Sequence, residues 1–431
     1  MKRNLLIGCS WLFALAIFTA KAQQNNAPPA NANTTPAGNP AAAAGRGRGG
    51  VAVKSPEVTP DGRVTFRLYA PTAQAVAVTG VSGRLALTKD DRGVWSATTD
   101  VLKPDIYTYS FNVDGASLPD PANLDRKTGI TGSFQSAVLV APPDTSWVTR
   151  NVPHGSVTHQ FFHSSAIGDD RDFYVYTPPN FDASGKTRYP VLYLLHGLGD
   201  DASAWTTMGR ANIILDNLIA GGKAKPMIMV NTLGYGIADP GNHFNDIIPN
   251  PNDNFGKYTA SLLNEVIPLV DKGYPTIKTR DGRALSGLSM GGAETFYVGF
   301  NHVDEFSYLA GMSSAFVMYP GAMPATPAAP PAGAPAAGGP PAGARGPQQQ
   351  VIDPAVFAQV FPQFGPKDAA KLKLIYIACG TDDSLIGVNR TFKTWLKDKD
   401  ISFKDVETPG AHTWSVWRNN LTDVAPMLFQ K

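Results

Sequence analysis

Two stretches of the chain differ in how hydrophobic and polar residues alternate. Between residues 51 and 143, short runs such as 64–69 and 107–113 alternate apolar and polar positions, with turn residues at regular intervals. This period of two is typical of half-buried strands, and many short strands of this kind indicate a small all-β sandwich. From 152 to 431, continuous apolar runs alternate with amphipathic helical patterns. This second region is predicted to be an α/β domain with a mostly parallel sheet.

Individual elements of the second region follow from the same pattern. An uninterrupted apolar run indicates a strand buried on both faces, whereas apolar residues at spacings of three and four indicate a helix. The predicted strands cover 190–195, 283–286, 307–313, 373–381 and 401–407, and the predicted helices cover 258–270, 293–298 and 414–428.

The amino-terminal residues are predicted to lie outside both domains. Two basic residues precede an apolar stretch, and Ala-Lys-Ala at 20–22 fits a small-x-small cleavage site, so residues 1–22 have the pattern of an export signal. We therefore expect a secreted or periplasmic protein with no membrane association after signal removal. Residues 23–50, rich in Asn, Pro and Ala, are interpreted as a disordered spacer.

A second low-complexity segment interrupts the α/β domain. Residues 320–350 are almost entirely Pro, Ala and Gly, and they follow a predicted strand that ends near Ser313. A long loop without regular structure is unusual inside a compact domain, so we interpret the segment as an insertion. If this strand is parallel to its neighbours, the insertion begins at the carboxyl edge of the sheet, where ligands of open α/β folds bind. The insertion is expected either to flank the cleft or to be a tolerated solvent-exposed loop.

Composition adds mainly exclusions. The 431 residues include 37 basic and 35 acidic ones, and loss of the signal removes three basic residues, so the mature chain is nearly neutral and is not predicted to bind nucleic acid. Cys9 lies in the signal, which leaves Cys379 without a disulfide partner and excludes cysteine-based metal sites. Asp239, Asp246 and Asp253 do not have the spacing of a calcium-binding EF-hand loop. No metal and no cofactor are predicted.

The segment Gly287-Leu-Ser-Met-Gly291 carries the clearest chemical signal. It fits the Gly-x-Ser-x-Gly elbow, in which a nucleophilic serine lies on a sharp turn between a strand and a helix. The predicted strand before Ser289 and the predicted helix after it agree with this context. A side chain at either glycine would clash where strand and helix come together. Ser289 is therefore predicted to be a hydrolase nucleophile, against the alternative of a plain Gly/Ser-rich turn.

The loop after residues 190–195 is predicted to supply part of an oxyanion hole. The strand ends in His196-Gly197, and hydrolases of this fold place a main-chain donor at such a strand end. Two N–H groups aimed at a tetrahedral intermediate stabilise its negative oxygen, and we assign them to Leu198 and Met290. His196 is interpreted as a structural residue, because the donors required here are main-chain groups.

The other members of a catalytic triad are expected after the serine in the chain. The strand 373–381 runs into Asp382 and Asp383, of which we choose Asp383 as the acid, with Asp382 capping the following turn. His412 lies on a loop ahead of a helix, with no competing histidine nearby in the sequence. In the predicted mechanism, His412 takes the Ser289 proton while Asp383 fixes the imidazole tautomer. An acyl-enzyme then forms and is cleaved by water.

These residues resemble carbohydrate esterase family 1, which includes feruloyl esterases, acetyl xylan esterases and esterase D-like enzymes. The resemblance implies an α/β-hydrolase fold, and it puts the nucleophile, acid, base and oxyanion donors at the five positions already named. The layout is also similar to siderophore esterases and mycolyl transferases, so it implies the chemistry more closely than the acyl group. The matching pieces are Tyr176-Thr-Pro-Pro179, Tyr189-Pro-Val-Leu-Tyr-Leu-Leu-His-Gly197, the serine elbow, Cys379-Gly-Thr-Asp-Asp-Ser-Leu385 and Glu407-Thr-Pro-Gly-Ala-His-Thr-Trp-Ser-Val-Trp417.

The sandwich has a resemblance of its own, to the immunoglobulin-like amino-terminal domains of glycogen-branching enzymes and of some esterases of the same family. One interpretation is a glycan-binding module that stacks sugars on Trp95 or Tyr107. The other, which we favour, is a packing domain in which these aromatic residues belong to the core. A role of the sandwich in shaping the esterase cleft is left open. The matching pieces are Tyr69-Ala-Pro71, Gly93-Val-Trp95, Val113-Asp-Gly115 and Asp120-Pro121.

Substrate-binding side chains are sought near the predicted triad. Trp205 and His243 lie in segments that are expected to line the acyl or sugar site, and Trp414 follows His412 closely. These three residues are the candidates for contact with the substrate.

The sequence thus predicts an exported serine carboxylic-ester hydrolase that removes feruloyl or acetyl groups from plant cell-wall xylan. Its expected partner is an acylated polysaccharide or oligosaccharide. The enzyme alternative is a siderophore esterase of the enterochelin type or a general carboxylesterase. The non-enzyme alternative is a glycan-binding protein with an inactive hydrolase domain. Against it, the serine turn, the acid, the base and the oxyanion loop are all present.

Overall fold

The computed structural model describes residues 51–81, 83–132, 134–142, 145–248, 250–322 and 350–430. The predicted signal (1–22), the predicted spacer (23–50) and nearly all of the predicted insertion (320–350) lie outside these residues. Within the described ranges, no helix is long and apolar enough to cross a membrane. The described residues form one compact unit.

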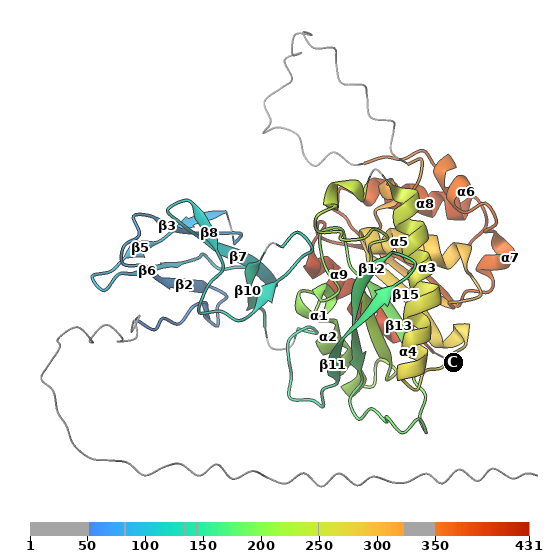
Figure 1. Ribbon diagram of the computed structural model, residues 1–431, viewed down its shortest axis with the longest axis horizontal. Coiled ribbons are helices and arrows are strands. Elements are labelled where there is room, and N and C mark those ends of the chain that lie inside the picture. The colour runs from blue at the N-terminus through green and yellow to red at the C-terminus, as the bar shows by residue number, and fades with distance from the viewer. Residues whose placement is uncertain are drawn as a thin grey trace, which may run out of the picture. The chain divides into compact units, whose positions relative to one another are not determined.

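The amino-terminal part of this unit consists of two small antiparallel sheets (Figure 1). Alternate residues of β2 are buried, as the alternating pattern predicts. The first sheet has the strand order β1 (Glu57–Val58), β2 (Val64–Tyr69), β6 (Val94–Thr98), β5 (Thr88–Lys89). The second has the order β4 (Arg84–Ala86), β3 (Val76–Thr79), β7 (Asp105–Val113), β10 (Gln135–Val140), β9 (Arg126–Lys127), and β8 (Ala116–Leu118) pairs with β7.

Aromatic residues are prominent in the core of the sandwich. Phe66, Tyr109 and Phe111 are fully buried there. Trp95 is also buried, and its indole N–H donates a hydrogen bond to the Ala70 carbonyl at 2.9 Å. A buried indole whose polar end is satisfied belongs to the core, so Trp95 does not offer an exposed stacking surface. Tyr107 on β7 is only partly buried.

The second domain is built on one eight-stranded sheet (Figure 1). The strands are, in spatial order, β11 (Ser156–Ser164), β12 (Asp169–Thr177), β14 (Ile228–Thr232), β13 (Val191–Leu195), β15 (Arg283–Leu288), β16 (Tyr308–Met312), β17 (Leu374–Gly380) and β18 (Lys404–Thr408). β12 is antiparallel to both β11 and β14, whereas all pairs from β14 to β18 are parallel. The carboxyl ends of the parallel strands therefore share one edge of the sheet.

Helices pack on both faces of this sheet. Side chains of α3 (Pro251–Ser261), α4 (Ile267–Gly273), α5 (Met290–Asn301), α6 (Ala355–Val360) and α8 (Ile386–Lys397) join one hydrophobic cluster. Those of α1 (Ala204–Thr207), α2 (Ala211–Ala220) and α9 (Trp414–Val424) join a second cluster. The short helix α7 (Pro366–Ala369) has no buried residue.

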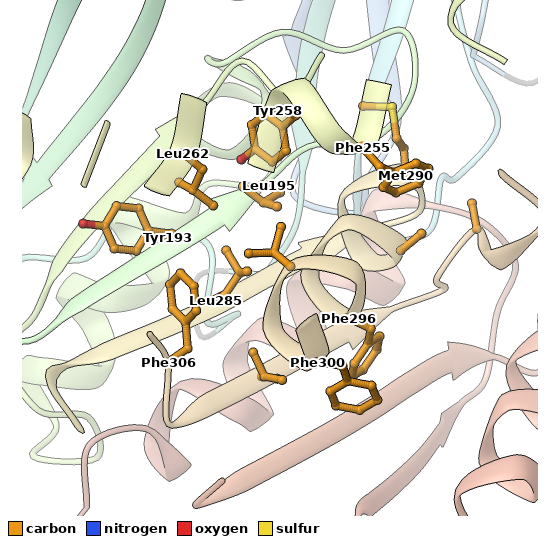
Figure 2. Packing of buried hydrophobic residues seen from close by; sticks show 14 of the residues in the cluster. Tyr193, Leu195, Phe255, Tyr258, Leu262, Leu285, Met290, Phe296, Phe300 and Phe306 are labelled. Atoms are coloured by element: carbon orange, nitrogen blue, oxygen red, sulfur yellow. The ribbon is translucent and has the colours of Figure 1, made fainter. Parts of the chain in front are cut away.

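The central strand β13 shows why its sequence is apolar throughout. Tyr193 and Leu195 belong to the first cluster, and Leu192 and Leu194 belong to the second. Successive side chains of a strand point to opposite faces, so a strand covered on both sides has no polar position. Figure 2 shows part of the first cluster, in which Leu195 lies among strand and helix residues that include Leu285, Phe296 and Tyr258.

The predicted fold class, a mostly parallel α/β-hydrolase sheet preceded by an all-β sandwich, is confirmed. The predicted elements of the α/β domain are all present, with shifts at their ends. The last strand begins at Lys404 instead of residue 401. The helix predicted at 258–270 begins at Pro251 and contains a π-helical turn at 262–266.

The sandwich and the α/β domain share part of a hydrophobic cluster. Ala137 of β10 and Trp147, which lies between β10 and β11, are buried in the cluster that covers the α2 and α9 face of the large sheet. The Asn217 side-chain amide donates hydrogen bonds to the carbonyls of Ser146 at 2.7 Å and Val148 at 2.9 Å. The segment between the domains is therefore packed against α2.

Candidate active site

Ser289 lies at the sharp turn between β15 and α5. Its backbone has φ 52° and ψ −115°, a combination that non-glycine residues rarely adopt. A Cβ atom added to Gly287 would lie 2.4 Å from the Gly291 backbone, and one added to Gly291 would lie 2.5 Å from the His196 carbonyl oxygen. Strand and helix can approach this closely only because both positions are glycine.

Three side chains from separate segments meet at this turn. Ser289 Oγ lies 3.0 Å from His412 Nε2, and His412 Nδ1 lies 2.8 Å from Asp383 Oδ2. Asp383 follows β17, and His412 lies between β18 and α9, so each comes from the carboxyl end of a parallel strand. The residues predicted as nucleophile, base and acid are thus brought into one hydrogen-bonded chain.

The surroundings of Asp383 favour its charged form. The carboxylate is fully buried, whereas the His412 side chain is 34% exposed. Burial raises the pKa of Asp383, but the hydrogen bond and charge of His412, together with the Leu385 N–H at 2.8 Å, outweigh burial and lower the pKa below its ordinary value. A charged Asp383 places the proton of a neutral imidazole on Nδ1, so Nε2 can accept the proton of Ser289. Asp382 is exposed.

The predicted oxyanion donors flank Ser289. Met290 is the first residue of α5, where a main-chain N–H has no acceptor within the helix. Leu198 follows Gly197, and a Cβ atom on Gly197 would lie 3.3 Å from Ser289 Cβ. Both N–H groups therefore belong to the immediate surroundings of the serine.

His196 fixes the start of the oxyanion loop (residues 196–200). Its Nδ1 lies 2.8 Å from the Gly197 carbonyl oxygen, and its Nε2 accepts a hydrogen bond from the Gly234 N–H at 2.9 Å. Burial lowers the pKa of His196, so the ring is neutral with its proton on Nδ1. Both ring nitrogens are used, which agrees with the structural role interpreted from the sequence.

A buried arginine holds the neighbouring loop after β14. The Arg171 guanidinium, on β12, donates hydrogen bonds to the carbonyls of Leu233, Tyr235 and Ile237. The Tyr235 hydroxyl in turn accepts a hydrogen bond from the Gly199 N–H at 2.8 Å. The oxyanion loop is therefore tied to β12 through two successive contacts.

A cleft of about 390 Å³ opens beside Ser289 and His412. Both domains contribute to it, so the sandwich forms one wall of the cleft, which is the role that the sequence left open. From the α/β domain the lining residues include Gly197, Leu198, Asp200, Met208, Leu288, Thr413, Trp414 and Trp417. From the sandwich they are Gly80, Asp105, Ile106, Tyr107, Thr108 and Lys127, which we call the sandwich wall.

The three candidates for substrate contact have different positions. Trp414 lines the cleft. Trp205 does not, because its side chain is fully buried, donates its indole N–H to the Leu195 carbonyl at 2.8 Å and packs edge-on against Trp414. Its expected role in substrate contact is therefore corrected to support of Trp414. His243 is exposed beside Asp246, at 3.1 Å, and is not among the lining residues.

The sandwich wall supplies residues that the sequence did not indicate. The Lys127 ammonium lies 2.9 Å from the Asp200 carboxylate, and the Thr128 hydroxyl donates to Asp201 at 2.6 Å. Both carboxylates come just after Leu198, whereas their partners belong to the sandwich side of the chain. No local pattern links residues so far apart in sequence. The alternation in β7 is the only relevant sequence pattern. One face of such a strand covers the sandwich core, so its other face is available to contact a neighbouring domain.

Two buried ionisable side chains near the site do not take part in the hydrogen bonds that join Ser289, His412 and Asp383. Glu294 on α5 is fully buried, and in the described part of the chain neither of its carboxylate oxygens has a hydrogen-bond partner. Burial raises the pKa of Glu294 well above its ordinary value, although Arg171 opposes this. Burial also raises the pKa of the Cys379 thiol to about 12, so Cys379 is a core thiol and not a thiolate nucleophile. Among the described residues, no cluster of His, Cys, Asp and Glu side chains could hold a metal ion.

A larger cavity, of about 650 Å³, lies at the other end of the parallel strands. Its walls include Pro190 before β13, Pro226 before β14 and Asp281 before β15. These are amino ends of strands, whereas ligands of open α/β sheets bind at the carboxyl ends. The smaller cleft beside Ser289 is therefore the candidate active site.

An eight-stranded sheet of this order, with a strained serine turn after β15, defines an α/β-hydrolase. The esterase family model matches residues 164–428, more than half of the chain, and the chain belongs to this family. A model for carbohydrate-binding module 48, the isoamylase N-terminal domain, matches residues 51–127. The enzyme class is accordingly carboxylic ester hydrolase, and the two resemblances noted in the sequence are confirmed.

Curated relatives include xylan-degrading and acetyl-ester-cleaving proteins by name. The chain is 29% identical over 390 residues to an endo-1,4-beta-xylanase/feruloyl esterase from Xylanibacter ruminicola, which covers 87% of this chain and 46% of that protein. It is 24% identical over 246 residues to an acetyl esterase from Caldicellulosiruptor saccharolyticus, which covers 54% of this chain and 80% of that protein. The chain thus spans about half the length of the Xylanibacter protein.

Solved structures with a similar fold include an enterochelin esterase from Shigella flexneri, with a TM-score of 0.58 at 17% identity over 87% of this chain and 94% of that chain. A ferulic acid esterase from Anaeromyces mucronatus in complex with ferulic acid has a TM-score of 0.50 at 19% identity, over 67% of this chain and 96% of that chain. At these identities the similarity concerns the fold.

Proposed function

We propose that this chain is a serine esterase in which Ser289 is the nucleophile, His412 the base and Asp383 the acid. The observation that carries the proposal is the chain of hydrogen bonds from Asp383 through His412 to a serine with a positive φ. Such backbone strain costs roughly 1–3 kcal/mol and persists where the surrounding structure maintains it for a function.

The residues suggest the following course of reaction. His412 Nε2 accepts the Ser289 proton as Oγ attacks the carbonyl carbon of the ester, and Asp383 stabilises the imidazolium that forms. The N–H groups of Leu198 and Met290 donate to the developing oxyanion, where the loss of one donor typically costs about 3 kcal/mol. His412 then protonates the departing alcohol. A water molecule, deprotonated by His412, finally cleaves the acyl-enzyme.

The proposed substrate is a feruloyl or acetyl ester on xylan. The names of the Xylanibacter and Caldicellulosiruptor relatives support both acyl groups. The cleft also combines the aromatic rings of Tyr107 and Trp414 with the Lys127–Asp200 ion pair. Aromatic rings pack against phenolic or sugar rings, and the ion pair offers donors and acceptors to hydroxyl groups.

The proposed partner is an acylated polysaccharide or oligosaccharide outside the cytoplasm. The signal pattern at 1–22 supports export. Export would bring the enzyme to a polymeric substrate of this kind, which lies outside the cell. Neither nucleic acid nor a membrane has a role in the proposed activity.

A second candidate function is hydrolysis of a siderophore ester. It is favoured by the similarity to the enterochelin esterase fold, which covers 87% of this chain. A general carboxylesterase would use the same residues. A glycan-binding protein with an inactive hydrolase domain would have no need of a strained serine turn.

Hydrolysis by the purified mature chain separates these functions. The substrates are methyl ferulate, acetylated xylan, a short-chain nitrophenyl ester and a cyclic catecholate siderophore, and Ser289→Ala is the matched control. We expect turnover of ferulate or acetyl xylan to be fastest and to be lost in Ser289→Ala. Preference for the siderophore would transfer the proposal to the second candidate, and no turnover of any ester would reject the enzyme.

A further inference from the structure

Arg418 connects the helix after the candidate base to the sandwich. It lies on α9, which begins at Trp414, and its side chain is fully buried. Its Nη2 forms an ion pair with the Asp105 carboxylate on β7, and its Nη1 donates to the Met208 carbonyl at 2.6 Å. The guanidinium also lies 4.4 Å from the centre of the Trp147 ring. One side chain of α9 thus contacts Asp105 of the sandwich wall, the end of α1 at Met208, and Trp147 between the domains.

A guanidinium in this position depends on its carboxylate partner. Burial lowers the pKa of Arg418 to about 10, while Asp105 acts in the opposite direction. Within the described residues its Nε has no hydrogen-bond partner, so few other groups compensate the charge. Asp105 is 24% exposed, whereas the Arg418 side chain is fully buried, so removing the Asp105 carboxylate would leave the guanidinium charge uncompensated where water cannot replace its partner. The ion pair therefore fixes the orientation of α9 against β7.

Trp417, the residue of α9 just before Arg418, contacts the candidate base. The Trp417 ring meets the His412 ring edge-on, with centres 4.8 Å apart and planes at 86°. The Trp417 indole N–H donates to Ser313 Oγ at 3.1 Å. His412 itself lies in the short segment before α9. A rotation of α9 that broke the contact with Asp105 would therefore also move the ring against which His412 rests.

A second link joins the sandwich side to the oxyanion loop. Lys127 pairs with Asp200, and Thr128 donates to Asp201, both within three residues of Leu198. The two main-chain segments that carry His412 and Leu198 are thus both held by contacts with the sandwich side of the chain.

We propose that Arg418, held by Asp105, is a positioning residue for His412 and acts through α9 and Trp417. The sandwich is thereby part of the catalytic structure for every ester, small ones included. The inference rests on the proposed function, because it takes His412 as the base. A module that only concentrates the enzyme on a polymer would change turnover of the polymer alone. A positioning contact changes kcat for a small ester that never reaches beyond the cleft.

The test is steady-state hydrolysis of a short-chain nitrophenyl ester by the mature chain. Asp105→Asn removes the carboxylate charge at nearly constant size, and we expect kcat to fall about tenfold or more with KM little changed, because small displacements of catalytic groups can cost up to about 100-fold. Asp105→Glu keeps the carboxylate and is expected to recover part of the loss. Glu57→Gln is the control, because it breaks an ion pair with Arg67 at 3.0 Å inside the sandwich and is expected to leave kcat unchanged.

A double variant keeps the test decisive if Asp105→Asn folds poorly. Asp105→Leu combined with Arg418→Met replaces the pair by apolar side chains, a change that is often neutral for stability. At a thermal midpoint equal to that of the unmodified chain, we expect kcat to stay reduced about tenfold and hydrogen exchange to rise in residues 409–418. A folded double variant with unreduced kcat would overturn the inference and leave the proposed function intact. An unmodified chain that hydrolyses no ester would overturn the proposed function, and the inference with it.

Discussion

The two walls of the cleft are positioned in different ways. On the α/β side, the candidate catalytic residues follow strands of one continuous sheet, so the ladder of β15, β16, β17 and β18 sets their spacing. On the sandwich side, the wall is an outer surface of a separate domain, and specific contacts such as Arg418–Asp105 and Lys127–Asp200 set its position. Topology therefore determines where the candidate catalytic residues lie, and side-chain contacts between domains determine the shape of the cleft beside them.

The two domains also differ in the hydrophobic packing that supports each wall. The large sheet is covered on both faces by separate clusters, whereas the sandwich has one small cluster of its own. A single substitution in the smaller core should consequently remove a larger share of the stability of its domain. The following predictions test this difference, beginning with the largest expected effect.

The α/β wall should be sensitive to the charge of Asp383. In Asp383→Asn the amide cannot stabilise the imidazolium or select the productive tautomer, and a loss of about 10⁴-fold in kcat is expected at unchanged fold. Steady-state kinetics on the nitrophenyl ester, with thermal unfolding as the check on folding, measures this. Asp382→Asn is the matched control, since Asp382 is exposed and adjacent. A loss below tenfold in Asp383→Asn would assign the acid elsewhere.

The stability of the sandwich, and with it the position of the sandwich wall, should depend on the sandwich core. Trp95→Ala removes a buried indole and its hydrogen bond to Ala70, at an expected cost of about 3–5 kcal/mol. Because the sandwich contacts α9, activity on a small ester should be lost over the same urea range in which the sandwich unfolds. Val101→Ala, at a position 55% exposed, serves as the control. Full activity at urea concentrations that unfold the sandwich would show that the second wall is dispensable.

A smaller effect is expected at Glu294, behind the serine turn. The folded state raises its pKa, so the folded protein keeps a proton that the unfolded chain releases above its ordinary pKa of 4.5. Stability contributed by this group is therefore lost as the pH rises from about that value toward the folded pKa. Glu294→Gln has no proton to release, and its thermal midpoint relative to the unmodified chain should increase with pH, each kcal/mol being about 2–4 °C. A difference between the two midpoints that does not change with pH would contradict a neutral Glu294.

The smallest effect is expected at Cys379. The thiol is buried and its pKa is raised to about 12, so it is neither accessible nor ionised near neutral pH. Iodoacetamide should leave esterase activity unchanged, whereas a serine-directed fluorophosphonate should abolish it. Inactivation by iodoacetamide in the native state would indicate that β17 opens far more readily than its burial implies.

The parts of the site that depend on local sequence could be predicted. Ser289 is marked by the glycines that a strained turn requires, and Asp383 and His412 follow apolar runs that form neighbouring strands. Chain order then assigns their roles. The same local reasoning identified the buried strands, since a strand covered on both faces has no polar position.

The parts that depend on contacts between distant segments could not be predicted. Trp205 and Trp414 are both tryptophans near the site, but only packing decides that one is buried behind the other. Arg418 reads as a polar position on an amphipathic helix, and its burial follows from a partner in another domain. Tyr107 has the alternation of a core residue and does pack against the sandwich core, but it also lines the cleft. Nothing in the spacing of these residues encodes their partners.

The hydrogen bonds of Arg171 have a consequence for how a substrate is received. Because one guanidinium fixes the loop at 233–237, and Tyr235 in turn fixes the oxyanion loop, the entropy of ordering these segments is included in the folding free energy. Ordering a backbone costs roughly 1–2 kcal/mol per residue, and here the binding of an ester does not have to offset it. Association with substrate should accordingly be a single kinetic step, without a slower phase in which the oxyanion loop closes.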